Sequence, residues 1–172
     1  MTEALKQNDA ELYIPIAQIG CFFRSSANMA EQEAEKEKKP IHFLTAEQLN
    51  KLWDLSINFK YIKKELDPVT NKVDYTVILS AAIANLALDM LGISGRFVEV
   101  ATFQNGKMNW YGSVKGEQKR ADYFIQRIKQ NGPSKTHFRN VYADGVLLWD
   151  PHRPQIQVQD IYYTICYRFD KR

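Results

Sequence analysis

The chain has 172 residues, which fits one domain on the usual range of about 100 to 200 residues per domain and argues against two separate catalytic domains. Hydrophobic residues make up 45% and charged residues 25%, so the composition excludes an intrinsically disordered chain. The 23 Lys and Arg exceed the 20 Asp and Glu by only three. Because the charges also interleave, we expect neither a nucleic-acid partner nor an anionic membrane partner.

The cysteine content and the N-terminus indicate a reducing, cytoplasmic setting. Cys21 and Cys166 are too few for a disulfide scaffold, and three histidines add little toward a zinc site, so we expect no metal and no cofactor. The first ten residues lack the basic start and apolar run of a secretory signal. The most apolar stretch, 77–91, is shorter than the roughly 20 residues that a membrane span needs. We expect a single domain over 1–172 with a polar leader of about ten residues.

The N-terminal part contains the entry into a helix. Residues 12–19 are predicted as a short apolar segment that Pro15 keeps extended, and Gly20 then leads into a helix beginning at Cys21. The run 31–39 consists almost entirely of Glu and Lys, which predicts a solvated end for this helix.

Two further helices are predicted in the first half of the chain. Thr45 and Gln48 have the spacing of a capping box, so a second helix is expected directly after Thr45. The cluster 67–71 is rich in turn-forming residues. Residues 77–91 are then predicted as a third helix that ends at Gly92.

Strand patterns dominate the second half. Residues 96–103 and 107–111 flank the turn dipeptide Asn105-Gly106 and predict an antiparallel hairpin. The spacing of apolar residues predicts an amphipathic helix over 116–130. Two more strands, 136–143 and 146–150, flank Asp144-Gly145, and a last strand covers 161–169. Helices followed by an antiparallel sheet predict an α+β fold.

The register of the hairpin at Asp144-Gly145 brings ionisable side chains together. A two-residue turn pairs Ala143 with Val146, Val141 with Leu148, Arg139 with Asp150 and His137 with His152. His137 and Asp150 then share a face on a diagonal of about 7 to 8 Å, across which an imidazole–carboxylate hydrogen bond is feasible. Such a carboxylate orients the imidazole and stabilises its protonated form. The alternative is an exposed His and Asp at the end of a sheet.

Cys21 is the candidate nucleophile. In the first turn of a helix, free amide groups and the helix dipole stabilise a thiolate, and a nearby protonated His does the same. The alternative is a small buried apolar residue, the commoner state of a free cysteine. Cys166 lies in the middle of a strand and is predicted to be structural.

These motifs resemble the papain-like cysteine peptidases, most closely the bacterial branch typified by bacteriocin-processing peptidases. A Gln precedes the cysteine that begins a helix, a late His begins a strand, and Asp150-Pro151 follows the partner strand. The resemblance implies Cys21 as nucleophile, His137 as general base and acid, Asp150 as orienting group and Gln18 as oxyanion-hole donor beside the Cys21 amide. It also implies a papain-like fold whose first helix carries Cys21. Gln18 lies closer to the cysteine than the family's Gln does.

The implied activity is hydrolysis of a peptide or isopeptide bond through an acyl-enzyme intermediate, with a peptide or a peptidoglycan stem as substrate. One alternative is a catalytically silent papain-like protein with a binding or structural role. A second is a metal hydrolase that uses His137, Asp150 and His152, which lacks a convincing Glu base nearby. The sequence indicates neither the oligomeric state nor the substrate.

Overall fold

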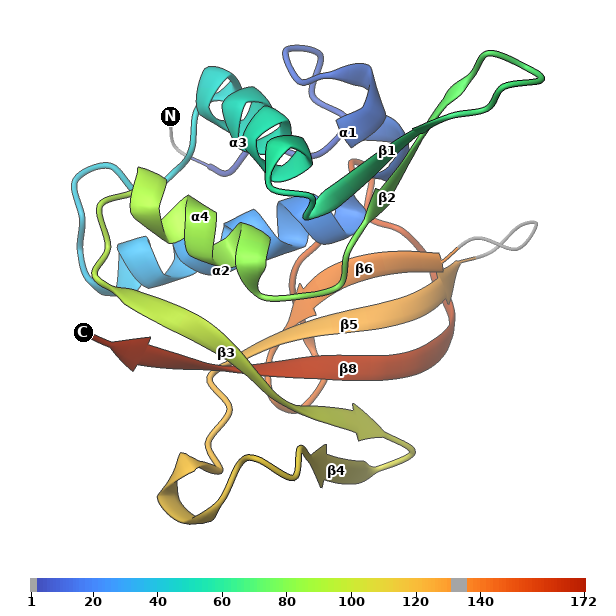
Figure 1. Cartoon of the computed structure of the whole chain (residues 1–172). Coiled ribbons are helices and arrows are strands. Elements are labelled where there is room, and N and C mark those ends of the chain that lie inside the picture. The colour runs from blue at the N-terminus through green and yellow to red at the C-terminus, as the bar shows by residue number, and fades with distance from the viewer. Residues whose placement is uncertain (1–2, 131–135) are drawn as a thin grey trace.

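The computed structural model describes residues 3–130 and 136–172 and is an α+β fold, in which the helices of the first half cover one face of an antiparallel sheet (Figure 1). The helices are α1 (Ile14–Ile19), α2 (Cys21–Lys36), α3 (Ala46–Asn58), α4 (Ala82–Met90) and the short 3₁₀ helix η1 (Gly116–Gln118). The predicted order of helices followed by an antiparallel sheet is therefore confirmed. No helix in the described ranges combines the length and the hydropathy needed to cross a membrane.

The strands form two separate sheets. They are β1 (Ile62–Leu66), β2 (Val73–Val77), β3 (Gly95–Gln104), β4 (Lys107–Trp110), β5 (Tyr123–Gln130), β6 (Thr136–Val141), β7 (Leu147–Trp149) and β8 (Val158–Lys171). The large sheet has the order β4-β3-β8-β5-β6-β7, and β1 and β2 form a hairpin of their own. This hairpin projects from the helical layer past the edge of the large sheet (Figure 1), and the sequence analysis did not predict it.

The segment before Cys21 is helical, so its predicted extended form is wrong. Pro15 lies in the first turn of α1, where its missing N–H costs no hydrogen bond and its fixed φ favours a helix start. Gly20 ends α1 and directly precedes α2. The helix that carries Cys21 is therefore the second helix, whereas the sequence predicted it as the first.

Helix α2 lies at the centre of the molecule, between α4 and the sheet, and is buried over most of its length. Arg24 and Glu31 form an ion pair of 3.0 Å with both side chains almost fully buried. Glu33 is also buried and accepts a hydrogen bond from the Tyr123 hydroxyl. The prediction that 31–39 is solvated is thus wrong for these two glutamates, which are buried with a counter-ion for Glu31 and a hydroxyl donor for Glu33.

Helix α3 begins where its local sequence signal predicts, and α4 begins later than predicted. Both hydrogen bonds of the capping box between Thr45 and Gln48 are present at the start of α3, as predicted. Helix α4 begins at Ala82. The predicted start of this helix at residue 77 is too early, because Val77 belongs to β2. Gly92 follows α4 with φ +69°, the left-handed conformation expected after a helix end.

The helix predicted over 116–130 is replaced by η1 and β5. A β-bulge between Arg127 and Ile128 interrupts the pairing of β5 with β8. The extra residue of this bulge, Tyr162, belongs to β8, and the pairing of β5 with β6 is regular. Strand β5 lies between β8 and β6 and is buried on both faces, so Ile125 and Ile128 are both fully buried although they point to opposite faces. The helical spacing in the sequence comes from this central strand with two buried faces.

The β6–β7 hairpin differs from the prediction at its turn and agrees with it beyond. The Tyr142 amide donates to the Val146 carbonyl, and Val141 pairs with Leu147, one residue away from the predicted register. A bulge then restores the predicted register, so that Asn140 pairs with Trp149. The end of the hairpin that carries His137 and Asp150 therefore has the predicted alignment.

Candidate active site

Cys21 is the first residue of α2 and is half-buried on the wall of a cleft. The N–H groups of the first turn of a helix have no acceptor within that helix, so the sulfur lies beside unpaired donors. Gly20 makes this position possible, because a Cβ atom there would run into the carbonyl oxygen of Ile16. The close succession of α1 and α2 therefore fixes where the thiol lies.

His137 is the second residue of β6, after Thr136, and is almost completely buried. Its Nε2 atom lies 2.8 Å from Oδ1 of Asp150. Burial lowers the pKa of His137, but hydrogen bonds with the side chains of Asp150 and Cys21, and the charges of both, raise it to about 9. Since Asp150 takes Nε2, the ring's other nitrogen, Nδ1, is left for the side facing Cys21.

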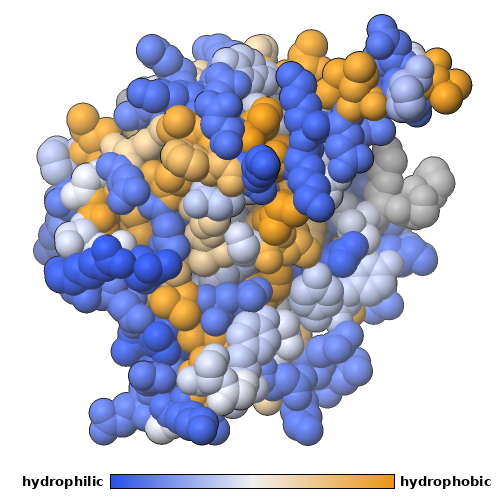
Figure 2. All heavy atoms as spheres, viewed as in Figure 1, coloured by the Kyte–Doolittle hydropathy of each residue, from blue (hydrophilic) through white to orange (hydrophobic). Residues whose placement is uncertain are grey.

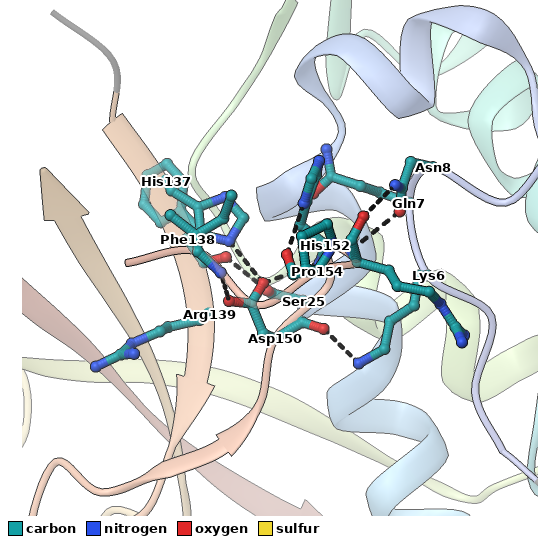
Figure 3. A network of polar contacts seen from close by, with 12 residues as sticks. Lys6, Gln7, Asn8, Ser25, His137, Phe138, Arg139, Asp150, His152 and Pro154 are labelled. Atoms are coloured by element: carbon teal, nitrogen blue, oxygen red, sulfur yellow. Dashed lines mark hydrogen bonds and ion pairs between the residues drawn. The ribbon is translucent and has the colours of Figure 1, made fainter. Parts of the chain in front are cut away.

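Asp150 follows β7, and its carboxylate accepts from three donors. Figure 3 shows it between His137 and His152. Besides the contact with His137, Oδ1 accepts the His152 amide at 2.9 Å, and Oδ2 accepts the Ile156 amide at 3.0 Å. Burial raises the pKa of Asp150, but the hydrogen bonds from His137 and the two backbone amides outweigh it and lower the pKa below its usual range. The carboxylate is therefore ionised, and its orientation is fixed.

Two contacts hold the helix carrying Cys21 against the strand carrying His137. The Asn140 side chain donates to the Ser25 carbonyl at 3.1 Å, and the Ser25 hydroxyl lies 3.5 Å from the Phe138 carbonyl. All of these groups are buried. Because they lie one turn from Cys21 and within three residues of His137, they fix the spacing between the two elements.

The N-terminal segment takes part in the site, which the sequence analysis missed by treating it as a leader. The Gln7 amide donates to the Pro151 carbonyl at 2.6 Å, and the Gln7 side chain donates to the Ala17 carbonyl at 3.1 Å. Lys6 donates to the Asp150 carbonyl and lies over the Trp149 ring. The segment thus connects the end of α1 to the turn after β7. The only sequence signal that this segment packs on the protein is the apolar pair Ala4-Leu5 before Lys6.

The cleft beside Cys21 has a volume of about 650 Å³. Gln18 is exposed and lines the same cleft as Cys21 and His137. The four candidate residues from the sequence therefore lie together, with Asp150 behind His137. Among the described residues, the cleft is lined by Gln7, Ala17, Gln18, Ile19, Cys21, Phe22, Tyr75, Thr76, Val77, Leu79, Gln130, Thr136, His137, Phe138, His152 and Ile156.

Cys166 has none of these features. It is fully buried, and its sulfur lies 3.8 Å from the sulfur of Met108. Burial, and to a lesser degree the charge of Glu99, raise its pKa to about 12. The interpretation of Cys166 as a structural residue agrees with this environment.

The second histidine of the cleft does not build a metal centre with its neighbours. The His152 ring makes a hydrogen bond of 2.9 Å between Nδ1 and the Pro154 carbonyl, and its centre is 6.3 Å from that of His137. Both carboxylate oxygens of Asp150 are engaged by N–H donors. Within the ranges that the structure describes, no group of three His, Cys, Asp or Glu residues could hold a metal ion.

The arrangement joins a thiol, an imidazole with a raised pKa and a buried carboxylate in series beside an open cleft. Such a series can move a proton between sulfur and imidazole while the carboxylate compensates the positive charge. No family model, curated protein or solved structure matches the chain.

Proposed function

We propose that the protein is a cysteine peptidase or amidohydrolase that cleaves a peptide or isopeptide bond through Cys21, His137 and Asp150. The observation that carries the proposal is the buried 2.8 Å contact between His137 and Asp150, at a cleft that Cys21 and the same imidazole line together. A buried ion-pair partner for His137 supports a protonated imidazole at neutral pH, which favours the thiolate form of the cysteine beside it.

In the proposed reaction the Cys21 sulfur attacks the carbonyl carbon of the substrate amide. The His137 imidazolium gives its proton to the leaving nitrogen, the C–N bond breaks, and a thioester and a free amine result. His137 then takes a proton from water, the resulting hydroxide attacks the thioester, and the carboxylic acid and the Cys21 thiolate are released. Asp150 keeps the ring orientation through both steps.

The amide of Cys21 and the side chain of Gln18 are the proposed donors to the developing oxyanion. The first has no acceptor within α2, and the second is an exposed amide on the same cleft. The order of cysteine helix, histidine strand and aspartate after the partner strand also supports a papain-like fold as part of this proposal.

The experiment is acylation by p-nitrophenyl acetate. We expect a burst of p-nitrophenolate equal to the enzyme concentration, then steady turnover, with one acetyl group located on Cys21 by mass spectrometry. Cys21→Ala and His137→Ala should abolish the burst and keep a folded circular dichroism spectrum. Cys166→Ala is the matched control and should keep the burst. Acetylation spread over lysines, unchanged in the first two variants, would contradict the proposal and favour a silent binding protein.

A further inference from the structure

The wall of the cleft opposite His137 is the free edge of β2. Tyr75, Thr76 and Val77 all line the cleft, although successive side chains of a strand point to opposite faces. Because all three consecutive residues lie on one wall, the backbone of the strand must face the cleft. The Tyr75 ring is turned toward the core and lies 5.6 Å from the Trp53 ring, which leaves the backbone toward the cleft.

The hydrogen-bond pattern of the hairpin shows which backbone groups are unpaired. The Ile78 amide donates to the Tyr61 carbonyl, and the Asp67 amide donates to the Lys72 carbonyl, at the two ends of the same register. Hydrogen-bonded pairs alternate along an antiparallel ladder. By this alternation, Lys63↔Thr76 and Glu65↔Asp74 are hydrogen-bonded pairs.

The intervening residues of β2 point their backbone groups away from β1. These residues are Val73, Tyr75 and Val77, and two of them, Tyr75 and Val77, line the cleft. Among the described residues, no hydrogen bond pairs the N–H or C=O groups of these two. An edge strand with unpaired groups is a template for another extended chain.

We propose that the substrate is bound as an extended peptide segment that pairs with the free edge of β2 and so becomes a third strand of the hairpin. This inference rests on the proposed function, because it seats the scissile carbonyl at Cys21. Apart from the reacting pair Cys21 and His137, the described lining of the cleft contains no Asp, Glu, Lys or Arg, which suits the uncharged backbone of a peptide. When a peptide pairs with the edge of a sheet, hydrogen bonds between the two main chains provide the affinity.

The hairpin extends this edge beyond the cleft. It projects from the body of the molecule, and apolar side chains lie at its tip, where Leu66 is 60% and Val69 is 89% exposed (Figure 2). The five residues of β2 span about 14 Å at the usual rise per residue. A segment paired along all of β2 would run outward from Cys21 toward this tip.

The test compares two reagents that alkylate Cys21. Iodoacetamide needs only a reactive thiol. Acetyl-Ala-Ala-Ala chloromethyl ketone adds an extended backbone, and the Cys21 sulfur displaces chloride from its methylene carbon to form a thioether. N-methylation of one alanine at a time removes one N–H. We expect methylation to slow the peptide reagent about tenfold only at alternate positions, those whose N–H faces β2.

Proline variants test the same contact from the side of the protein. Val77→Pro and Tyr75→Pro remove N–H groups that face away from β1 and leave the ladder of the hairpin intact. At least one of them should slow the peptide reagent about tenfold, with the iodoacetamide rate unchanged. Val73→Pro is the matched control, because its N–H lies on the same edge outside the cleft lining, and it should change neither rate.

The two proposals fail in different ways. Iodoacetamide labelling of Cys21 that does not depend on His137 would overturn the proposed function. Labelling that does depend on His137, with a peptide reagent insensitive to N-methylation at every position, would overturn the pairing with β2 alone. A dimer that Val77→Pro dissociates in sedimentation velocity, with both rates unchanged, would assign the edge to a second copy and also overturn this inference.

Discussion

The Nε2 atom of His137 lies 2.8 Å from Oδ1 of Asp150, although the whole β6–β7 hairpin separates the two residues. The contact is buried, and the carboxylate has two further donors from the backbone. A carboxylate in this setting stabilises the protonated form of the imidazole. The charge state of His137 therefore depends on Asp150.

Replacing Asp150 with Asn should lower the pKa of His137. The substitution preserves the size of the side chain and removes its charge, so the midpoint should fall from about 9 by roughly 1 to 3 pH units. The measurement is a pH titration of the His137 ring by NMR, with His42 as an internal reference. Asp160→Asn, at an exposed position of β8, is the matched control. An unchanged midpoint in Asp150→Asn would contradict the assigned ion pair.

Folding stability should fall at alkaline pH because of His137. Its pKa is raised in the folded protein, from 6.5 to about 9, so the folded state holds the proton more tightly than the unfolded state. The resulting stabilisation is fully present below about pH 6.5 and is lost as the pH rises through about 9, on the order of 3 kcal/mol. Urea unfolding at several pH values should show this slope in the wild type and in His42→Gln. His137→Gln should lack it, and equal slopes in all three would contradict the prediction.

Adding one methyl group at Gly20 should displace the helix that carries Cys21. The new Cβ atom would run into the Ile16 backbone, which belongs to a helix and cannot move aside cheaply. Gly20→Ala should therefore destabilise the fold by about 1 to 3 kcal/mol and slow the alkylation of Cys21. At Gly112 an added Cβ meets nothing within 4 Å, so Gly112→Ala is the control and should leave both properties unchanged. Thermal unfolding and iodoacetamide kinetics measure the two effects.

The buried ion pair inside α2 should contribute strongly to stability. Glu31 accepts hydrogen bonds from Arg24, Asn28 and the Leu44 amide, and its loss would leave the Arg24 charge buried without a counter-ion. Glu31→Ala should cost about 3 to 5 kcal/mol of unfolding free energy in urea. Glu35→Ala, on the exposed face of the same helix, should change stability by less than about 0.5 kcal/mol. Comparable losses in both variants would show that the pair is not buried in solution.

Local signals in the sequence predicted the parts of the fold that depend on local chemistry. The helix start at Cys21, the capping box at Thr45 and the Asn105-Gly106 turn each rest on the conformational preferences of a few adjacent residues. The turn has positive φ angles at both residues, as the Asn-Gly dipeptide predicts. The alignment of His137 with Asp150 agrees with the prediction because the bulge between Asn140 and Val141 cancels the one-residue offset at the turn.

The sequence could not predict features that depend on the tertiary environment. The burial of Glu31 requires Arg24 two turns earlier in α2 and a backbone amide from Leu44 outside the helix, which composition does not reveal. The burial of both faces of the central strand β5 gave it the apolar spacing of a helix. Gln7 belongs to the site because its amide reaches Pro151, which is distant in the chain. The β1–β2 hairpin alternates too little in burial to be distinguished from a loop.

The most direct test of the central claim is the pH dependence of Cys21 alkylation by iodoacetamide, followed by mass spectrometry. We expect rapid labelling at about pH 6, far below the pH of about 8.5 at which an ordinary thiol is half ionised, and loss of this labelling in His137→Ala. Cys166 is the internal comparison and should stay unlabelled, because it is fully buried. Slow labelling of Cys21, with the same ordinary pH profile in both proteins, would contradict an active thiol–imidazole pair.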